Sequence, residues 1–163
     1  MPIATHLYLP DPAATEAAGA RLARELASGM IVALHGDLGA GKTTLARGVL
    51  RGLGYTGTVK SPSYTLVELY SLSSLYLYHF DFYRFADPSE WATSGFAEHF
   101  RDDSVCLIEW PERVAPWLPA ADLDLALALP PDGRDARMLR ATAHTAQGER
   151  CLRAIASALA PPA

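Results

Sequence analysis

The sequence is poor in several residue types, and each scarcity narrows the classes of protein to consider. It contains no asparagine, one glutamine (Gln147), two lysines (Lys42 and Lys60) and two cysteines (Cys106 and Cys151). Two cysteines are too few for a disulfide scaffold or a zinc cluster. Their scarcity favours a reducing compartment, and we expect a cytoplasmic protein.

Long apolar runs and clusters of basic residues are also missing. No apolar run reaches the roughly 18 residues of a membrane span, and residues 1–15 carry neither the basic nor the hydrophobic region of a secretory signal. The net charge is −4, from 14 basic and 18 acidic residues, and the arginines are scattered along the chain. Proteins that bind nucleic acid through its phosphates usually present a basic face. The composition therefore disfavours a membrane protein and direct binding of DNA or RNA.

Length and patterning favour one layered α/β domain that spans residues 1–163. Hydrophobic residues make up 50% of the chain and charged residues 20%, which is typical of a folded core. Residues 30–35 and 105–109 are short apolar runs of the kind found in strands buried on both faces of a parallel sheet. Helical signals alternate with them, at 12–28, at 42–53, after Asp87, and at 147–159 with Leu152, Ile155 and Leu159 on one face.

Antiparallel hairpins are expected as additions to this sheet. Residues alternate with period two at 64–70 and 75–80, and strand-like segments follow at 122–129 and 137–142. A serine-rich turn joins the first pair, and Pro-Asp-Gly at 131–133 joins the second.

The most informative motif is GDLGAGKT at residues 36–43, which matches the phosphate-binding pattern G-x-x-x-x-G-K-[ST] between a predicted strand and a predicted helix. Glycines let backbone N–H groups turn inward around phosphate oxygens, and the helix N-terminus adds its unpaired N–H groups. Lys42 is expected to reach the β- and γ-phosphates, and the Thr43 hydroxyl to bind Mg²⁺. The expected nucleotide-binding residues are Asp37, Leu38, Gly39, Ala40, Gly41, Lys42, Thr43 and Thr44.

Such a site needs a further acidic group near the metal, at the end of a neighbouring apolar strand. Glu109 ends the apolar run that begins at Val105, and Asp81 follows residues 75–80. Either carboxylate satisfies this requirement, and the sequence does not decide which is the catalytic group. His35 and His79 are expected to be packed histidines rather than catalytic ones.

The nucleotide and the reaction follow partly from the missing residues. A chain without asparagine lacks the Asn-Lys-x-Asp motif that reads guanine, and Gln147 is too far along the chain to position water as in Ras-type GTPases. ATP is therefore favoured. A small-molecule kinase remains the alternative, with Arg134, Arg137 and Arg140 as candidates for an arginine-bearing lid over the acceptor, although a solvated strand face is the simpler interpretation. A nucleotide-dependent binding module without hydrolysis is the third hypothesis.

Four motifs occur in order with short spacers: GDLGAGKTT at 36–44, SPSYTLV at 61–67, HFDFYR at 79–84 and IEWPER at 108–113. Together they resemble the bacterial TsaE family, also called YjeE, over roughly residues 9–140. The main departure is Ser63, where family members often carry threonine, and the hydroxyl is kept.

The resemblance implies a P-loop NTPase fold, a three-layer sandwich with a mixed, mainly parallel sheet. It implies a weak ATPase that binds ATP or ADP with Mg²⁺ and serves the synthesis of threonylcarbamoyladenosine at position 37 of tRNA. The expected partners are TsaB and TsaD, which stimulate hydrolysis and are reset by it. The protein would then contact tRNA only indirectly, through this complex.

Residue roles are implied in the same way. Thr43 and Glu109 would be the metal ligands, and Lys42, Asp81 and Glu109 the catalytic residues. Arg134 would lie near the nucleotide base and Trp110 near the nucleotide. Residues 61–65 resemble a switch segment that a γ-phosphate would order.

Overall fold

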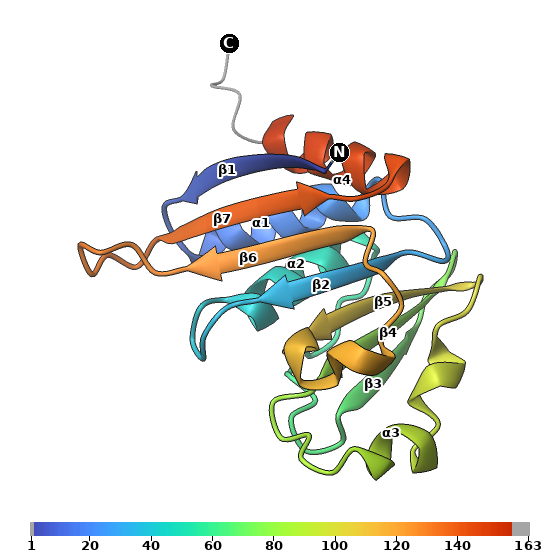
Figure 1. The fold of residues 1–163 in the computed structure, drawn as a ribbon. Coiled ribbons are helices and arrows are strands. Elements are labelled where there is room, and N and C mark those ends of the chain that lie inside the picture. The colour runs from blue at the N-terminus through green and yellow to red at the C-terminus, as the bar shows by residue number, and fades with distance from the viewer. Residues whose placement is uncertain (1, 158–163) are drawn as a thin grey trace.

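The sheet is built around a buried strand, β2 (Ile31–His35), in which all residues but the last are buried. β5 (Ser104–Glu109) and β6 (Leu123–Ala128) pair parallel with β2 on its two sides, and β4 (Tyr76–Asp81) pairs parallel with β5. The computed structural model describes residues 2–157 and contains one seven-stranded sheet in the order β1-β7-β6-β2-β5-β4-β3 (Figure 1). Its centre is parallel, as the sequence predicts.

Antiparallel strands extend this centre on both sides. β3 (Val67–Ser71) pairs with β4, and β7 (Arg137–Ala143) pairs with β6, so both predicted hairpins are confirmed. β1 (Ile3–Leu9) forms the edge beside β7 and was not predicted. In this strand only Leu7 and Leu9 are buried, which leaves too short an apolar pattern to detect in the sequence.

Helices lie on both faces of the sheet and complete the expected layered architecture (Figure 1). One face carries α1 (Pro12–Ala23), α2 (Lys42–Gly52) and α4 (Ala146–Ser157). The other carries only short helices, α3 (Ser89–Thr93), η1 (Phe96–His99) and η2 (Pro111–Trp117). None of the helices within residues 2–157 is both long and apolar enough to cross a membrane.

Local signals explain where several helices begin and end. The Asp11 side chain accepts a hydrogen bond from the Ala14 amide at 2.7 Å and caps α1, which then ends earlier than the helical pattern suggests. The Asp87 side chain accepts a hydrogen bond from the Ser89 amide at 3.0 Å, but the N-cap of α3 is Pro88, without a side-chain cap, and the helix has only five residues. Leu159, predicted to continue the last helix, lies outside the described residues.

Two hydrophobic clusters fill the space on either side of the sheet. The larger one joins α1, α2 and α4 to the aliphatic face of the strands and contains Leu22, Leu45 and Leu107, each with no exposed surface. The smaller one is aromatic, with the Phe80 and Phe82 rings stacked at 5.3 Å between centroids and Trp91 and Phe96 packed around them. The two clusters pack against opposite faces of the sheet and so hold β2, which leads to the loop at residues 36–41, from both sides.

The position of α2, which begins at that loop, depends on close contact with α1. A Cβ atom added to Gly48 would lie 2.0 Å from the Glu16 carbonyl oxygen, and one added to Gly19 would lie 2.3 Å from the Leu45 carbonyl oxygen. Any side chain at these positions would push the two helices apart.

We therefore expect Gly48→Ala to lower the free energy of unfolding. Alanine favours a helix by about 1 kcal/mol over glycine, but the clash is with backbone, and overpacking of this kind costs about 1–3 kcal/mol or more. Urea denaturation measures the balance, with Arg153→Ala as control because that side chain is exposed and, among residues 2–157, pairs with Glu149 alone. A Gly48→Ala protein as stable as the parent would show that the helices are not in contact here.

Both cysteines are expected to be unreactive in the folded protein. Cys106 is 1% exposed and Cys151 has no exposed surface, and burial raises the pKa of each thiol to about 12. The reactive thiolate is then on the order of one part in 10⁴ at pH 8. A thiol reagent at pH 8 should label neither residue until the chain is unfolded, and rapid labelling of the native protein would contradict the packing described here.

Candidate functional site

The loop between β2 and α2 has the backbone conformation that the glycine motif predicts. Gly36, Gly39 and Gly41 all have positive φ angles, at 144°, 80° and 104°. Gly36 cannot be replaced without a clash, because a Cβ atom there would lie 2.6 Å from the Leu127 carbonyl oxygen. Gly41 is the N-cap of α2 and offers no side-chain cap. The first amides of α2, which have no partner within the helix, therefore face the loop.

Lys42 is folded back onto this loop. Its ammonium group donates to the carbonyl oxygens of Gly36 and Asp37, the latter at 3.5 Å, and lies 3.8 Å from the centre of the Trp110 ring. The side chain is buried, and burial lowers the pKa of the Lys42 ammonium, although the nearby carboxylates of Glu109 and Asp81 oppose this shift. Lys42 thus supplies a partly desolvated cation beside the loop.

The two candidate carboxylates lie side by side at the ends of neighbouring strands. Asp81 is the last residue of β4 and Glu109 the last of β5, and the two are register partners in the parallel pair. Both are buried. The Thr43 hydroxyl lies 3.3 Å and 3.5 Å from the two Glu109 carboxylate oxygens, so the structure brings together the two predicted metal ligands.

Each carboxylate has a partner from another element. Glu109 contacts His79, whose Nε2 atom lies 2.6 Å from Glu109 Oε2. Asp81 accepts hydrogen bonds from the Ser61 hydroxyl and from the Tyr83 amide, the latter at 2.9 Å. The predicted switch segment is thereby joined to the end of β4.

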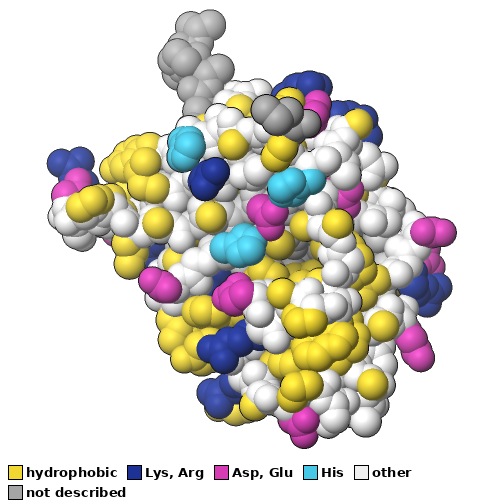
Figure 2. Space-filling view, in the orientation of Figure 1, with side chains coloured by type: hydrophobic (Ala, Val, Ile, Leu, Met, Phe, Trp, Pro, Cys, Tyr) yellow, Lys and Arg dark blue, Asp and Glu magenta, His cyan; other side chains and the backbone are white. Residues whose placement is uncertain are grey.

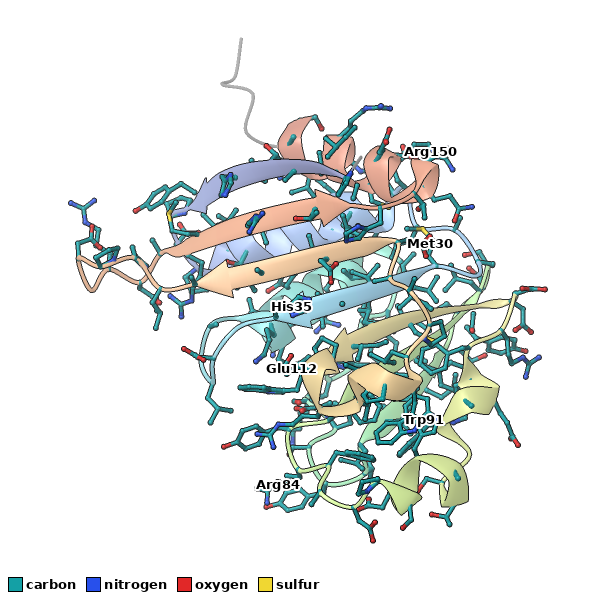
Figure 3. All side chains as sticks on the ribbon, in the orientation of Figure 1. Met30, His35, Arg84, Trp91, Glu112 and Arg150 are labelled. Atoms are coloured by element: carbon teal, nitrogen blue, oxygen red, sulfur yellow. The ribbon has the colours of Figure 1, made fainter. Side chains whose placement is uncertain are left out.

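A second contact holds the same segment. The Arg84 guanidinium lies 4.5 Å from the centre of the Tyr64 ring, and Tyr64 itself is 82% exposed. Figure 3 shows Arg84 in the loop that follows β4. Residues 61–64 therefore contact the end of β4 through Ser61 and Asp81, and the loop after β4 through Tyr64 and Arg84.

These residues surround a cleft of about 540 Å³. It is lined by most of the predicted site and also by Tyr83, Arg84 and Arg137, which were not predicted to bind the nucleotide. The full set of lining residues is Leu38, Gly39, Ala40, Gly41, Lys42, Thr43, Thr44, Ser61, Ser63, Asp81, Tyr83, Arg84, Glu109, Trp110 and Arg137. Asp37 and Arg134 are the predicted site residues that are not among the lining residues.

Arg134, which precedes β7, and Arg137, the first residue of β7, have different environments. Arg134 is 72% exposed and pairs with Asp132 at 3.2 Å in the turn between β6 and β7. Arg137 is only 17% exposed, and its guanidinium donates to the carbonyl oxygens of Ala40 at 2.8 Å and Gly39 at 3.0 Å. The expectation of a solvated face is wrong for Arg137, because its side chain turns across the sheet edge to the glycine loop.

The two histidines have different environments. His79 is fully buried, as expected of a packed histidine, and it contacts Glu109. Its position two residues before Asp81 on a strand places both side chains on one face. His35 is not packed inside the protein: it is half-exposed and binds Asp124 at 2.7 Å, with Glu112 at 3.9 Å. Figure 3 shows His35 at the end of β2 with Glu112 beside it.

The surface charge pattern agrees with the scattered arginines of the sequence. On the face shown in Figure 2, Lys and Arg side chains occur singly or in small groups and are mixed with acidic and hydrophobic ones. This face offers no continuous basic surface of the kind that phosphate-mediated nucleic-acid binding requires.

A parallel-centred sheet, with a glycine loop and a helix N-terminus following its central strand, defines an α/β protein with the P-loop NTPase fold. Residues 9–137 match the family described as "Threonylcarbamoyl adenosine biosynthesis protein TsaE". The chain therefore belongs to the TsaE family.

Individual relatives support the same assignment. The Haemophilus influenzae protein named "tRNA threonylcarbamoyladenosine biosynthesis protein TsaE" is 44% identical over 140 residues, which cover 83% of this chain and 89% of that protein. The Bacillus subtilis protein of the same name is 39% identical over 117 residues, covering 72% and 73%. The crystal structure of Bacillus subtilis YdiB superposes with a TM-score of 0.78 at 30% identity and covers 96% of this chain and 97% of that one.

Arg137→Ala should loosen the glycine loop. Hydrogen bonds from a charged donor contribute about 1.5–3 kcal/mol, so their loss should speed amide exchange in residues 36–41 by about 10- to 100-fold, since 1.4 kcal/mol is a factor of ten. Hydrogen-exchange mass spectrometry measures this. Arg134→Ala is the matched control and should leave the loop unchanged; equal effects of the two variants would refute the role given to Arg137.

Proposed function

We propose that this protein binds ATP or ADP with Mg²⁺ in the cleft and hydrolyses ATP as a subunit of the machinery that makes threonylcarbamoyladenosine in tRNA. The observation that carries the proposal is the meeting of the glycine loop, Lys42, Thr43 and Glu109 in one cleft. Membership of the TsaE family supports the pathway. In this role the protein acts in the cytoplasm.

The loop and the start of α2 bind the phosphates. Amides from residue 37 to residue 44 surround the β-phosphate, and the positive end of the helix dipole favours its charge. Lys42 exchanges its carbonyl partners on the loop for phosphate oxygens, which hold an ammonium group more strongly because they are charged. Trp110 limits where this ammonium group moves, because its ring lies 3.8 Å away.

Thr43, in the first turn of α2, and Glu109, at the end of β5, fit a magnesium ion. Neighbouring ligands of an octahedral Mg²⁺, each about 2.1 Å from the metal, lie about 3.0 Å apart, close to the 3.3 Å between the Thr43 and Glu109 oxygens. Within the part of the chain that the structure describes, no group of three or more His, Cys, Asp or Glu side chains suits a metal ion. Mg²⁺ at nucleotide sites needs only one or two protein ligands, since phosphates and water supply the others.

When bound, Mg²⁺ neutralises charge on the phosphates and orients them for attack by water. Thr43 and Glu109 would hold the ion. Asp81, at the adjacent strand end, is placed to orient the attacking water or the metal's water ligands. Glu109 and Asp81 both remain candidates for the catalytic group, because both are buried and both face the cleft.

Slow hydrolysis by the isolated protein is consistent with the contacts in the cleft. Lys42 is engaged with loop carbonyls and Asp81 with Ser61, so these two charged groups of the site already have partners within the protein. A partner protein that moves residues 61–65 would release Asp81 from Ser61. We infer that docking on TsaB and TsaD stimulates turnover in this way and that hydrolysis then resets their complex, while tRNA is contacted only through the partners.

The proposal is tested by following γ-labelled ATP with the purified chain, alone and with its cognate TsaB and TsaD. We expect slow release of inorganic phosphate that the partners accelerate. Equally fast hydrolysis with and without them would refute the resetting role, and transfer of the label to a small acceptor would support a kinase instead.

Two substitutions separate binding from hydrolysis in this assay. Lys42→Ala should remove most nucleotide binding, because a cation of the site is lost. Glu109→Gln should keep binding of ADP without Mg²⁺ but lower the stimulated rate by about 10²-fold or more, a typical loss for one group that stabilises a transition state. A Glu109→Gln protein with the parent rate in the presence of TsaB and TsaD would show that Glu109 has been assigned wrongly. Arg153→Ala, an exposed position on α4 that does not line the cleft, serves as the control with unchanged binding and rate.

A further inference from the structure

His79 forms a buried pair with Glu109, but the mechanism described so far gives His79 no role. His79 has no exposed surface, and its Nε2 atom lies 2.6 Å from Glu109 Oε2. Its other ring nitrogen, Nδ1, is buried without a hydrogen-bond partner, and among the described residues it is the only buried side-chain nitrogen or oxygen in this state. Buried polar atoms are nearly always satisfied, so packing alone does not explain a histidine here.

The sheet register explains how the two side chains meet. Leu77, His79 and Asp81 alternate along β4 and project from the same face. His79 is the register partner of Leu107 on β5, and Glu109 is the partner of Asp81. Glu109 therefore reaches diagonally back along the sheet to His79, a spacing that long side chains bridge. Thr43 approaches the same carboxylate from the other side.

The unpaired nitrogen also indicates which ring atom carries the proton. A proton on Nδ1 would be buried with no acceptor, whereas a proton on Nε2 is donated to a carboxylate oxygen at 2.6 Å. The bond occupies one side of Oε2 and fixes the direction of the whole carboxylate. The remaining lone pairs then face Thr43 and the cleft.

We propose that His79 is a positioning residue that holds the Glu109 carboxylate beside Thr43, so that both oxygen ligands are oriented for the Mg²⁺ of a bound nucleotide. The inference rests on the proposed function. It assigns His79 no contact with the nucleotide or with the metal. Its effect passes through Glu109, in the way that hydrogen-bond partners of metal ligands generally tune metal affinity.

Two substitutions of His79 separate positioning from packing. His79→Leu fills a similar space but donates no hydrogen bond, whereas the amide nitrogen of His79→Gln reaches about as far as Nε2 and still donates. Leu77→Ala is the control, because Leu77 is fully buried on the same face of β4, and its removal costs stability without touching Glu109. Calorimetry then measures binding of a non-hydrolysable ATP analogue, first with Mg²⁺ chelated and then over a series of Mg²⁺ concentrations.

We expect His79→Leu to raise the half-saturating Mg²⁺ concentration by about 10- to 100-fold, the usual effect of removing a ligand's hydrogen-bond partner. Its affinity for the analogue without Mg²⁺ should stay at the parent value, because the loop is untouched. His79→Gln and Leu77→Ala should both keep the parent requirement for Mg²⁺. A His79→Leu protein with the parent requirement would overturn the inference. So would a loss that is the same with and without Mg²⁺ and appears equally in all three variants.

The outcomes also separate this inference from the proposed function. A parent protein that binds no nucleotide refutes both, whereas a parent that binds with Mg²⁺ and a His79→Leu protein that is unaffected refute only the role of His79. Should the variants not fold, ¹⁵N NMR of the parent protein decides: a proton on Nε2 of His79 is expected, and an Nε2 atom without a proton would overturn the inference.

Discussion

Parallel pairing of β5 with β2 on one side and β4 on the other is the constraint on which the site depends. The carboxyl ends of parallel strands meet at one edge of a sheet, and here that edge receives the glycine loop after β2, Asp81 from β4 and Glu109 from β5. Glu109 is paired in register with both Leu34 and Asp81. A slip of one residue in β5 would turn its carboxylate to the opposite face, into the aromatic cluster around Phe80. Register therefore decides whether the chain has this site at all.

The charges at this edge are stable only as a group. A carboxylate or an ammonium group buried alone is strongly unfavourable, and the site holds Lys42, Asp81 and Glu109 at 5%, 5% and 3% exposure. His79, Thr43 and Ser61 supply hydrogen bonds to the acids, while the loop carbonyls accept from Lys42. Trp110 has a left-handed backbone conformation, with φ at 57°, and its ring lies beside the Lys42 ammonium group. Such strain of about 1–3 kcal/mol persists where surrounding contacts fix it, commonly at functional sites.

Much of the fold was predictable because its signals are local. Short apolar runs identified β2 and β5, and alternation identified both hairpins. The glycine motif predicted the loop and the start of α2, since positive φ angles at Gly36 and Gly41 require glycine and Lys42 follows at a fixed spacing. β1 escaped detection because its neighbour β7 is distant in sequence, and an edge strand with little buried surface has a weak pattern.

The missed parts of the site depend on contacts between distant segments. Arg137 reaches the glycine loop only because β7 lies beside β6, and nothing near Arg137 in the sequence indicates this. His79 is buried as predicted, but its contact with Glu109 was not predicted. Its position two residues from Asp81 already placed both on one strand face. The diagonal contact with Glu109, however, requires the register of β4 against β5. Sequence thus predicts which groups a segment carries, and the sheet decides which of them meet.

A crystal structure with a non-hydrolysable ATP analogue and Mg²⁺ tests the central claim most directly. The account predicts the phosphates on the amides of residues 37–44, the Lys42 ammonium moved from the loop carbonyls to phosphate oxygens, and the metal between Thr43 and Glu109. A nucleotide bound elsewhere, or a cleft that stays empty at saturating ligand with Glu109 turned away from Thr43, would contradict it.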